Sequence, residues 1–303
     1  MTQIFNGVEF TEEHGYIHID FSAGFDCVSS APGGGYLRDI SRISFGDYED
    51  CDLSIPCPRP ETVRTGSGEF GRTRVFAVAY SDLNSGLGRA AEVSEPGDGM
   101  THVLVIMDCD TPEYGMLRAT VTANEAVTAV VQDLLLRSDG GSEPASGSVC
   151  QSVTVVRNRN SDVFLHGAGK HGKLGQLIGE TVMTAVRESA SANGKSCESA
   201  SDAMEMLGMY GYSHEDLFNM TGCRDLNAFS VSLDRISMEP HVAASVSAVL
   251  FVADEIRWKL IPEEDGLSVI SGMMKEVFGY DDEVGNPAED IARALAAMAA
   301  GRI

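Results

Sequence analysis

The sequence predicts an α/β fold, with a layered mixed sheet and flanking helices, followed by a C-terminal all-helical extension. Three observations support this class. Valine-rich apolar segments at 74–80 and 102–108 are typical of central strands. Apolar residues recur at helical spacing within 112–136 and 174–190. Beyond residue 198 the strand patterns stop, and only helical patterns follow.

The first part of the chain predicts strands separated by glycine turns. Residues 16–21 (YIHIDF) alternate apolar and polar side chains, as a half-buried strand does. Residues 25–31 predict a strand that continues into the turn PGGGY, whose glycines permit positive φ. Residues 46–72 are rich in Pro, Gly and Asp and predict a long connection, and residues 81–100 predict a glycine- and acid-rich loop.

The middle of the chain alternates helices and strands. The helix at 112–136 is predicted from apolar positions at helical spacing, namely Leu117, Val121, Ala126, Val130, Val131 and Leu134. Residues 152–157 and 162–166 predict two strands joined by the polar turn NRNS. The helix at 174–190 follows from Leu177, Ile178, Val182 and Val186.

The last third predicts a separate helical extension. Residues 191–198 (SANGKSCE) have the composition of a linker. Beyond them, helical patterns occupy 199–210, 213–221, 240–260, 265–278 and 287–300. We therefore expect an α/β domain at 1–193 and a helical extension at 199–303.

The composition narrows the classes of partner. A net charge of −23 argues against nucleic acid and against an anionic membrane surface, because both require a basic face. No apolar run reaches the roughly 18 residues of a membrane helix. The first residues contain no cationic segment followed by an apolar one. We expect a cytoplasmic protein, and the sequence leaves open whether it forms a homo-oligomer.

The seven cysteines are scattered, and no CxxC pair occurs, so we expect no metal site. Most of them should be small buried residues in a reducing compartment. Cys150 lies in a turn of small residues, where it would be a thiolate nucleophile only if a cation lowered its pKa. His102, like other histidines without ligand spacing, is expected to be structural.

The loop HGAGKHGKLG at 166–175 concentrates chemistry at the start of a predicted helix. His166, Lys170, His171 and Lys173 lie beside glycines that leave backbone N–H groups free. Such a loop at a helix N-terminus can bind an anion or a polar group. The alternative is a mobile surface loop whose charges are only solvated.

Three segments in order resemble the adenosylcobinamide amidohydrolase family, an archaeal-type group of corrinoid salvage enzymes. They are VSSAPGGG at 28–35, the helix TVTANEAVTAVVQDL at 120–134, and ASGSVCQSVTVV with the following HGAGKHGKLGQLIGETV at 145–182. The family pattern pairs a Ser-Ser-Ala turn and glycines with a Thr-Glu-Ala-Lys helix. An Ala-Thr-Gly-Thr-Gly-Thr-Asp turn and a Gly-Lys-His loop follow. The resemblance spans residues 20–190.

The resemblance implies hydrolysis of the amide that joins aminopropanol to adenosylcobinamide, giving adenosylcobyric acid for coenzyme B12 assembly. It implies no cofactor, since the only metal is the cobalt of the corrinoid substrate.

The chain departs from the family pattern at polar positions. Gln151 stands in place of the aspartate, Asn124 and Val127 in place of the threonine and lysine, and Gln176 in place of a glutamate. Two alternatives therefore stay open: a corrinoid-binding paralogue without catalysis, and an amidase that acts on a different amide.

Amide hydrolysis requires a nucleophile or an activated water, a proton donor for the amine, and donors for the oxyanion. We expect His171 to be the general acid or base, Lys170 to stabilise the oxyanion, and Glu125 to activate water or hold a histidine. Each of these has a surface-exposed, non-functional alternative. The expected substrate-binding residues are Ser29, Ser30, Gly33, Gly34, Ser146, Ser148, His166, Gly169 and Lys173.

Overall fold

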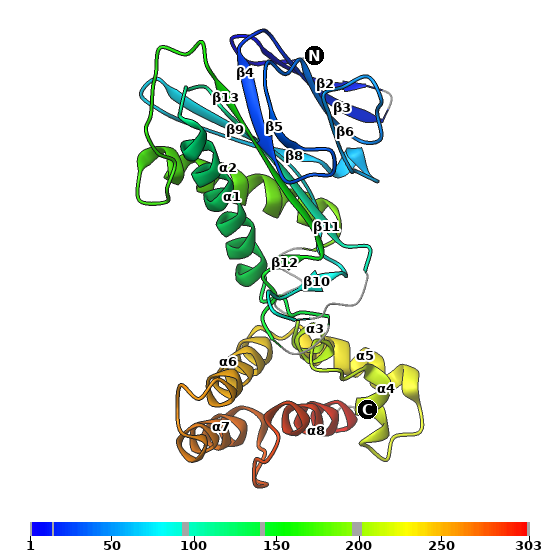
Figure 1. Ribbon diagram of the computed structural model, residues 1–303. Helices are drawn as coiled ribbons and strands as arrows, with labels where there is room; N and C mark the ends of the chain where they lie inside the picture. Colours follow the sequence, from blue (N-terminus) through cyan, green and yellow to red (C-terminus); the bar gives the residue numbers. More distant parts are fainter. Residues whose placement is uncertain (1, 14, 93–96, 140–142, 196–201, 302–303) are drawn as a thin grey trace. The chain divides into compact units, whose positions relative to one another are not determined.

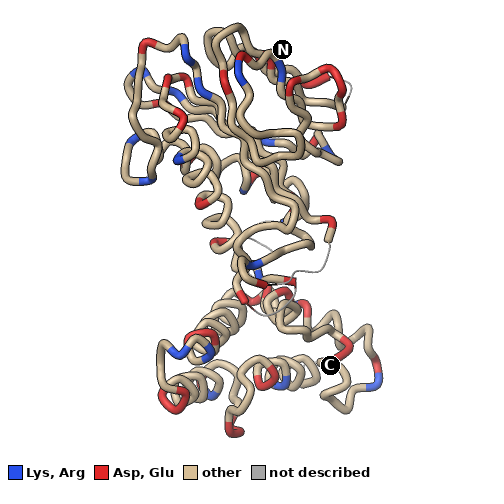
Figure 2. Tube along the Cα trace, in the orientation of Figure 1, with Lys and Arg blue, Asp and Glu red and all other residues tan. Residues whose placement is uncertain are grey.

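The structure, a computed structural model, describes residues 2–13, 15–92, 97–139, 143–195 and 202–301. The chain divides into two compact units, Met1–Ser196 and Cys197–Ile303. The first unit is mixed α/β and the second is helical, which confirms the predicted fold class (Figure 1). Acidic and basic residues are spread through both units (Figure 2).

A six-stranded mixed sheet forms the centre of the first unit. Its order is β5 (Gly35–Leu37), β4 (Phe25–Ser29), β13 (Cys150–Asn158), β11 (Met100–Met107), β9 (Thr73–Asp82) and β8 (Arg64–Phe70). Strands β11 and β13 are parallel and all other neighbours are antiparallel. Helices α1 (Glu113–Asp133) and α2 (Lys173–Ala192) pack on one face of this sheet (Figure 1).

A second sheet covers the other face. It contains β1 (Thr2–Phe5), β2 (Val8–Glu13), β3 (Tyr16–Phe21), β6 (Arg42–Phe45) and β7 (Leu53–Ile55). Buried side chains of both sheets, such as Ile19, Phe45, Tyr80 and Leu104, form one hydrophobic core. The short strands β10 (Leu87–Gly88) and β12 (Gly147–Ser148) pair with each other, and a 3₁₀ turn spans Pro60–Thr62.

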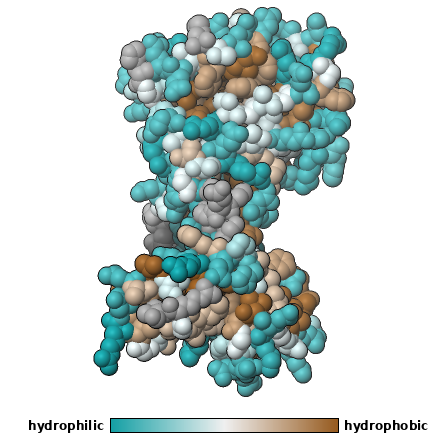
Figure 3. Space-filling model, turned by 180° about the vertical axis from the view of Figure 1, so that it is seen from behind, coloured by the Kyte–Doolittle hydropathy of each residue, from teal (hydrophilic) through white to brown (hydrophobic). Residues whose placement is uncertain are grey.

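The second unit has its own hydrophobic core. Every regular secondary-structure element among its described residues is a helix. The helices are α3 (Ala203–Gly208), α4 (His214–Asn219), α5 (Leu226–Ser237), α6 (Pro240–Arg257), α7 (Glu263–Phe278) and α8 (Pro287–Ala300). Apolar side chains also reach its surface among polar ones (Figure 3). No single described helix is long and apolar enough to cross a bilayer. Only α5 and α6 taken together meet that criterion, and they are bent by 80°.

Several element predictions were wrong. Residues 46–72 are not a plain connection, because they contain β7, the 3₁₀ turn and β8. Residues 162–166 form no strand; Phe164 makes a single bridge to Asp110. Helix α5 was missed altogether. The predicted linker at 191–198 starts inside α2, and its residues 196–198 lie outside the described part of the chain.

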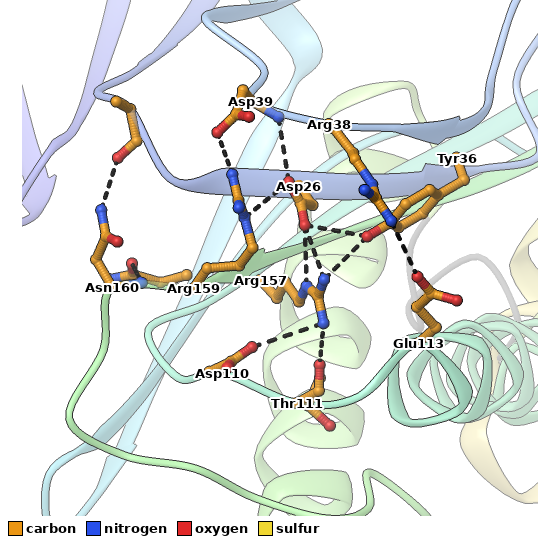
Figure 4. A network of polar contacts seen from close by, with 12 residues as sticks. Asp26, Tyr36, Arg38, Asp39, Asp110, Thr111, Glu113, Arg157, Arg159 and Asn160 are labelled. Atoms are coloured by element: carbon orange, nitrogen blue, oxygen red, sulfur yellow. Dashed lines mark hydrogen bonds and ion pairs between the residues drawn. The ribbon is translucent and has the colours of Figure 1, made fainter.

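A buried ion pair connects the central strands to the start of α1 (Figure 4). The carboxylate of Asp26 on β4 is fully buried and lies 2.8 Å from the guanidinium of Arg157 on β13. Arg157 also donates a 2.6 Å hydrogen bond to the carbonyl of Thr111, just before α1. Tyr36 and Arg159 complete the shell around Asp26. Burial opposes the charge of Asp26, but the hydrogen bonds, led by that of Arg157, outweigh it and lower the pKa of this carboxyl.

His102 is a second buried polar group of the central sheet. Its ring on β11 is 1% exposed, and its Nδ1 lies 2.7 Å from the hydroxyl of Ser152 on β13. Burial lowers the pKa of His102 from 6.5 to about 4, so the folded protein holds a neutral imidazole.

The substitution Asp26→Asn should lower the free energy of unfolding by about 3 kcal/mol, because it removes the carboxylate 2.8 Å from the mostly buried Arg157 and leaves only Asp110, at 3.6 Å. Urea denaturation at neutral pH measures this loss. The control is Asp133→Asn, which breaks the exposed pair between Asp133 and Arg187 and should cost less than about 1 kcal/mol. Equal losses in the two variants would contradict the importance of the buried pair.

His102 should make folding sensitive to moderate acid. Its pKa is lower in the folded chain than in the unfolded chain, so the unfolded chain binds more protons between pH 6.5 and about 4. This contribution to stability is complete above pH 6.5 and declines as the pH falls through that window, by about 3.5 kcal/mol over the whole window at about 1.4 kcal/mol per pKa unit. Urea denaturation of the wild type and of His102→Gln at pH 7 and pH 4.5 tests it. The wild type should lose more stability than the variant, and parallel losses would refute the assignment.

Candidate active site around helix α1

One face of α1 exposes apolar residues that take no part in the core. Tyr114, Leu117 and Val121 are 60%, 57% and 45% exposed. Their spacing of three and four residues places them on one side of the helix, and Glu125 continues the same row. The core face consists of other positions: Met116, Ala119, Ala123, Ala126, Val127, Val130 and Val131. Leu117 and Val121, two of the apolar positions whose spacing predicted this helix, therefore lie outside the core.

The glycine loop lies along one side of this exposed face. The hydroxyl of Thr122 donates a 2.8 Å hydrogen bond to the carbonyl of Ala168, in a buried contact. Further along the helix, Nζ of Lys170 lies 3.0 Å from Oε1 of Glu125. Gly169 is held from the α2 side, because a Cβ on Gly175 would lie only 2.1 Å from the Gly169 carbonyl oxygen. These contacts fix the position of the loop backbone at Lys170.

The turn at 146–151 lies along the other side. Thr128 donates a 2.7 Å hydrogen bond to the carbonyl of Ser146, and Nε2 of Gln151 donates a 2.6 Å bond to Oδ1 of Asn124. Residues two apart on a helix point in nearly opposite directions, since a turn contains 3.6 residues. Thr122 and Asn124 therefore reach to opposite sides, and the exposed face of α1 lies between the loop and the turn.

The space beside the exposed row is an open groove of about 440 Å³. Its lining consists of Tyr114, Leu117, Arg118, Val121, Gly167 and Gly169. Most of these residues are apolar or glycine, and the ion pair of Glu125 and Lys170 lies one turn further along the helix. A larger cavity, of about 570 Å³, lies between β1, β2, β8 and β9 and contains none of the predicted site residues.

His166 and Lys173 belong to a different hollow, on the β8–β9 side of the loop. This hollow of about 390 Å³ is lined by both residues and by Phe70, Arg72 and Leu174 among others. Lys173 donates a 2.8 Å hydrogen bond to Gln176, and its Nζ lies 5.2 Å from the centroid of the Phe70 ring. The structure thus separates these two residues from Glu125 and Lys170.

His171 is exposed at the end of the loop, between Lys170 and the start of α2. In the described part of the chain, no group of three or more histidine, cysteine, aspartate or glutamate side chains has the arrangement of a metal site.

The serine–glycine turn after β4 is held on β13. The hydroxyl of Ser29 is buried, lies 2.7 Å from that of Thr154 and accepts a hydrogen bond from the Ala31 N–H. The exposed Ser30 accepts a 2.9 Å bond from the Val153 N–H. Gly33 has a φ of +76°, and a Cβ on Gly34 would lie 2.8 Å from two carbonyl oxygens. Both serines thus have structural partners in this turn.

Ser146 and Ser148 also have structural partners, Ser146 in the 88–90 segment and Ser148 within the turn itself. The hydroxyl of Ser146 accepts a 3.1 Å hydrogen bond from the Ala90 N–H. Ser148 donates a 3.1 Å bond to the carbonyl of Cys150, and its N–H donates to Oε1 of Gln151. Ser146 therefore attaches the turn to the 88–90 segment, and Ser148 and Gln151 connect residues within the turn.

Two of the positions that depart from the resembled pattern contact each other. Asn124 and Gln151, from the helix and the turn, form the amide–amide hydrogen bond described above. Val127 is buried, and Gln176 connects Lys173 to Glu180 on the surface of α2. The contact between helix and turn is thus made here by two neutral amides.

Sequence reasoning missed Tyr114 and Arg118 as site residues. The available signal was the row of helical spacing 114–117–121–125, which differs from the row of small core residues and has Arg118 beside it. That row was overlooked because Leu117 and Val121 were used only as apolar positions that predict a helix.

Part of this unit is similar to a known family. Residues 61–198 match the model of a family described as adenosylcobinamide amidohydrolase. The match contains α1, the 146–151 turn and the glycine loop, whereas the serine–glycine turn at 28–35 precedes it. No curated protein matches the chain.

Gly175→Ala should displace the loop that carries Lys170, because the added Cβ would meet the Gly169 carbonyl at 2.1 Å. We expect a loss of about 1–3 kcal/mol in the free energy of unfolding, the usual cost of overpacking. The control is Gly179→Ala, also in α2, whose Cβ would meet nothing within 4 Å. This control should stabilise the helix by up to about 1 kcal/mol. Urea denaturation compares the two, and an equal response would contradict the close packing of loop and helix.

Proposed function

We propose that the protein hydrolyses the amide that links aminopropanol to adenosylcobinamide, because residues 61–198 match the model of the adenosylcobinamide amidohydrolase family. The products are adenosylcobyric acid and aminopropanol, and the reaction salvages a corrinoid for coenzyme B12 synthesis. The cobalt belongs to the substrate, and the proposed chemistry uses side chains alone.

The observation that carries this proposal is the convergence of separate segments on one face of α1. The glycine loop supplies Lys170, the helix supplies Glu125, and the 146–151 turn closes the opposite side through Gln151 and Asn124. A base and a cation thus lie next to an open apolar groove, which is the combination that an amidohydrolase with a bulky substrate requires.

The groove suits a broad macrocycle better than a small substrate. Its apolar row of Tyr114, Leu117 and Val121 is exposed and shallow, so a flat ring can rest on it without being enclosed. Glycines at 167 and 169 allow the loop backbone to approach the ring closely. With the ring in this position, a side arm directed along α1 reaches Glu125 and Lys170.

We assign the reacting steps to three residues. The Glu125 carboxylate removes a proton from a water molecule, and the water oxygen attacks the amide carbon. The ammonium of Lys170, released from Glu125 by the substrate, stabilises the developing oxyanion. His171 donates a proton to the amine nitrogen as the C–N bond breaks, which releases aminopropanol. In the unliganded protein, Lys170 and Glu125 neutralise each other at 3.0 Å.

The remaining expectations are also part of this proposal. We place the protein in the cytoplasm, where the cobinamide and the later enzymes of the pathway would meet. The proposal allows the protein to act as a homo-oligomer. It assigns no nucleic-acid or membrane partner.

The test is to incubate the intact protein with adenosylcobinamide and to quantify adenosylcobyric acid by chromatography. Glu125→Gln should reduce the turnover rate by about 100-fold or more, since it removes the base without changing the shape of the side chain. Glu188→Gln, an exposed glutamate on the same unit, is the matched control and should retain full activity.

Two outcomes would change the assignment. Corrinoid binding, seen as a change in the corrin absorption spectrum, without product would favour a binding protein that has lost the chemistry. Neither binding nor product would reject the proposed substrate altogether.

A further inference from the structure

The thiol of Cys150 lies beside a buried histidine, on a part of the sheet that the proposed hydrolysis does not use. Sγ of Cys150 is 4.0 Å from Nε2 of His102. The two residues come from adjacent parallel strands, where Cys150 is opposite Met100 and Ser152 is opposite His102. The contact therefore follows from the register of β11 and β13.

The imidazole is oriented to act on this thiol. Its Nδ1 lies 2.7 Å from the hydroxyl of Ser152, which fixes the plane of the ring and directs Nε2 toward Cys150. Burial lowers the pKa of the ring to about 4, so the imidazole is neutral and a weak base, and transfer of a proton from Sγ to Nε2 depends on the ion pair that the transfer creates. A thiolate 4.0 Å away would attract the resulting imidazolium, and this attraction opposes the effect of burial.

Cys150 differs from the other described cysteines in exposure. Its side chain is exposed, whereas Cys27, Cys57 and Cys109 are buried and Cys51 and Cys223 are half-buried. Burial raises the pKa of Cys27, Cys57 and Cys109 to about 12, so these three thiols are unreactive at neutral pH. Of the cysteines that the structure describes, Cys150 alone combines an exposed sulfur with a neighbouring base.

The thiol is on the opposite side of the sheet from the groove of α1. Side chains alternate along a strand, so Cys150 and Gln151 point to opposite faces of β13. Gln151 contacts α1 through Asn124, while Cys150 and Ser152 share the other face with His102. A reaction at Cys150 is therefore a separate activity and does not rest on the proposed function.

We propose that Cys150 is a site of thiol–disulfide exchange with small disulfides, in which His102 acts as the base. His102 takes the proton from Sγ, and the thiolate attacks one sulfur of the disulfide. The S–S bond of the small molecule breaks, a new S–S bond joins it to Cys150, and the leaving thiolate takes up the proton. A small thiol reverses the modification by the same steps.

Sulfur chemistry is preferred over acyl transfer for a physical reason. Attack on a carbonyl creates an oxyanion that needs two aligned donors. Disulfide exchange forms no oxyanion and needs only a thiolate, a base and access. The geometry on this face of the sheet provides an exposed thiol and an imidazole 4.0 Å from it.

The experiment uses the intact chain and oxidised glutathione at neutral pH, with peptide mass mapping to measure the rate of mixed-disulfide formation at each cysteine. Cys150 should react about ten-fold faster than Cys51 and Cys223. His102→Gln should slow the reaction at Cys150 by about ten-fold, while the rates at Cys51 and Cys223 stay unchanged.

If His102→Gln fails to fold, all its cysteines should form mixed disulfides at the same rate, and a second variant is then needed. Ser152→Ala frees the imidazole ring without removing the base, and it should slow Cys150 several-fold in a folded protein. The proposal is overturned if Cys150 in the wild type reacts no faster than Cys51 and Cys223. It is also overturned if neither folded variant slows Cys150.

Discussion

The ion pair between Asp26 and Arg157 is the interaction on which the arrangement of this unit depends. It connects β4 to β13 in the middle of the sheet, and Arg157 extends the connection to Thr111 at the start of α1 (Figure 4). A buried pair of charges tolerates little displacement, since each loses its partner if the strands shift. The pair therefore fixes both the register of the strands and the point from which α1 begins.

The position of α1 determines the candidate site. Because the helix begins at a fixed point, its exposed row of Tyr114, Leu117, Val121 and Glu125 has a fixed direction over the sheet. The loop and the turn then attach to its two sides through Thr122 and Asn124. A helix that only packed against the core would not need a polar contact on each side, at Thr122 and Asn124, with an exposed apolar row between them.

The central sheet separates the two proposed sites. On the helical face lie the groove and the pair of Glu125 and Lys170, both solvent-exposed. On the opposite face, the buried ring of His102 faces the thiol of Cys150. The two sites share the segment 146–151, whose successive side chains point alternately to one face and the other. A covalent modification of Cys150 would thus occur next to Gln151, which donates a hydrogen bond to Asn124.

The amino-acid sequence by itself determined the fold class, the central strands and α2, because long valine-rich runs and helical periodicity are local signals. It also identified the glycine loop and Glu125. It missed β8, and it placed a strand at 162–166, because short strands take their structure from whichever neighbour completes their hydrogen bonds. It also missed α5, although Phe229, Leu233 and Ile236 recur there at helical spacing. Only the tertiary structure decided that Leu117 and Val121 face solvent, that Lys170 rather than Lys173 meets Glu125, and that His102 lies beside Cys150. These three results depend on contacts between residues far apart in the chain, and no local pattern encodes such distances.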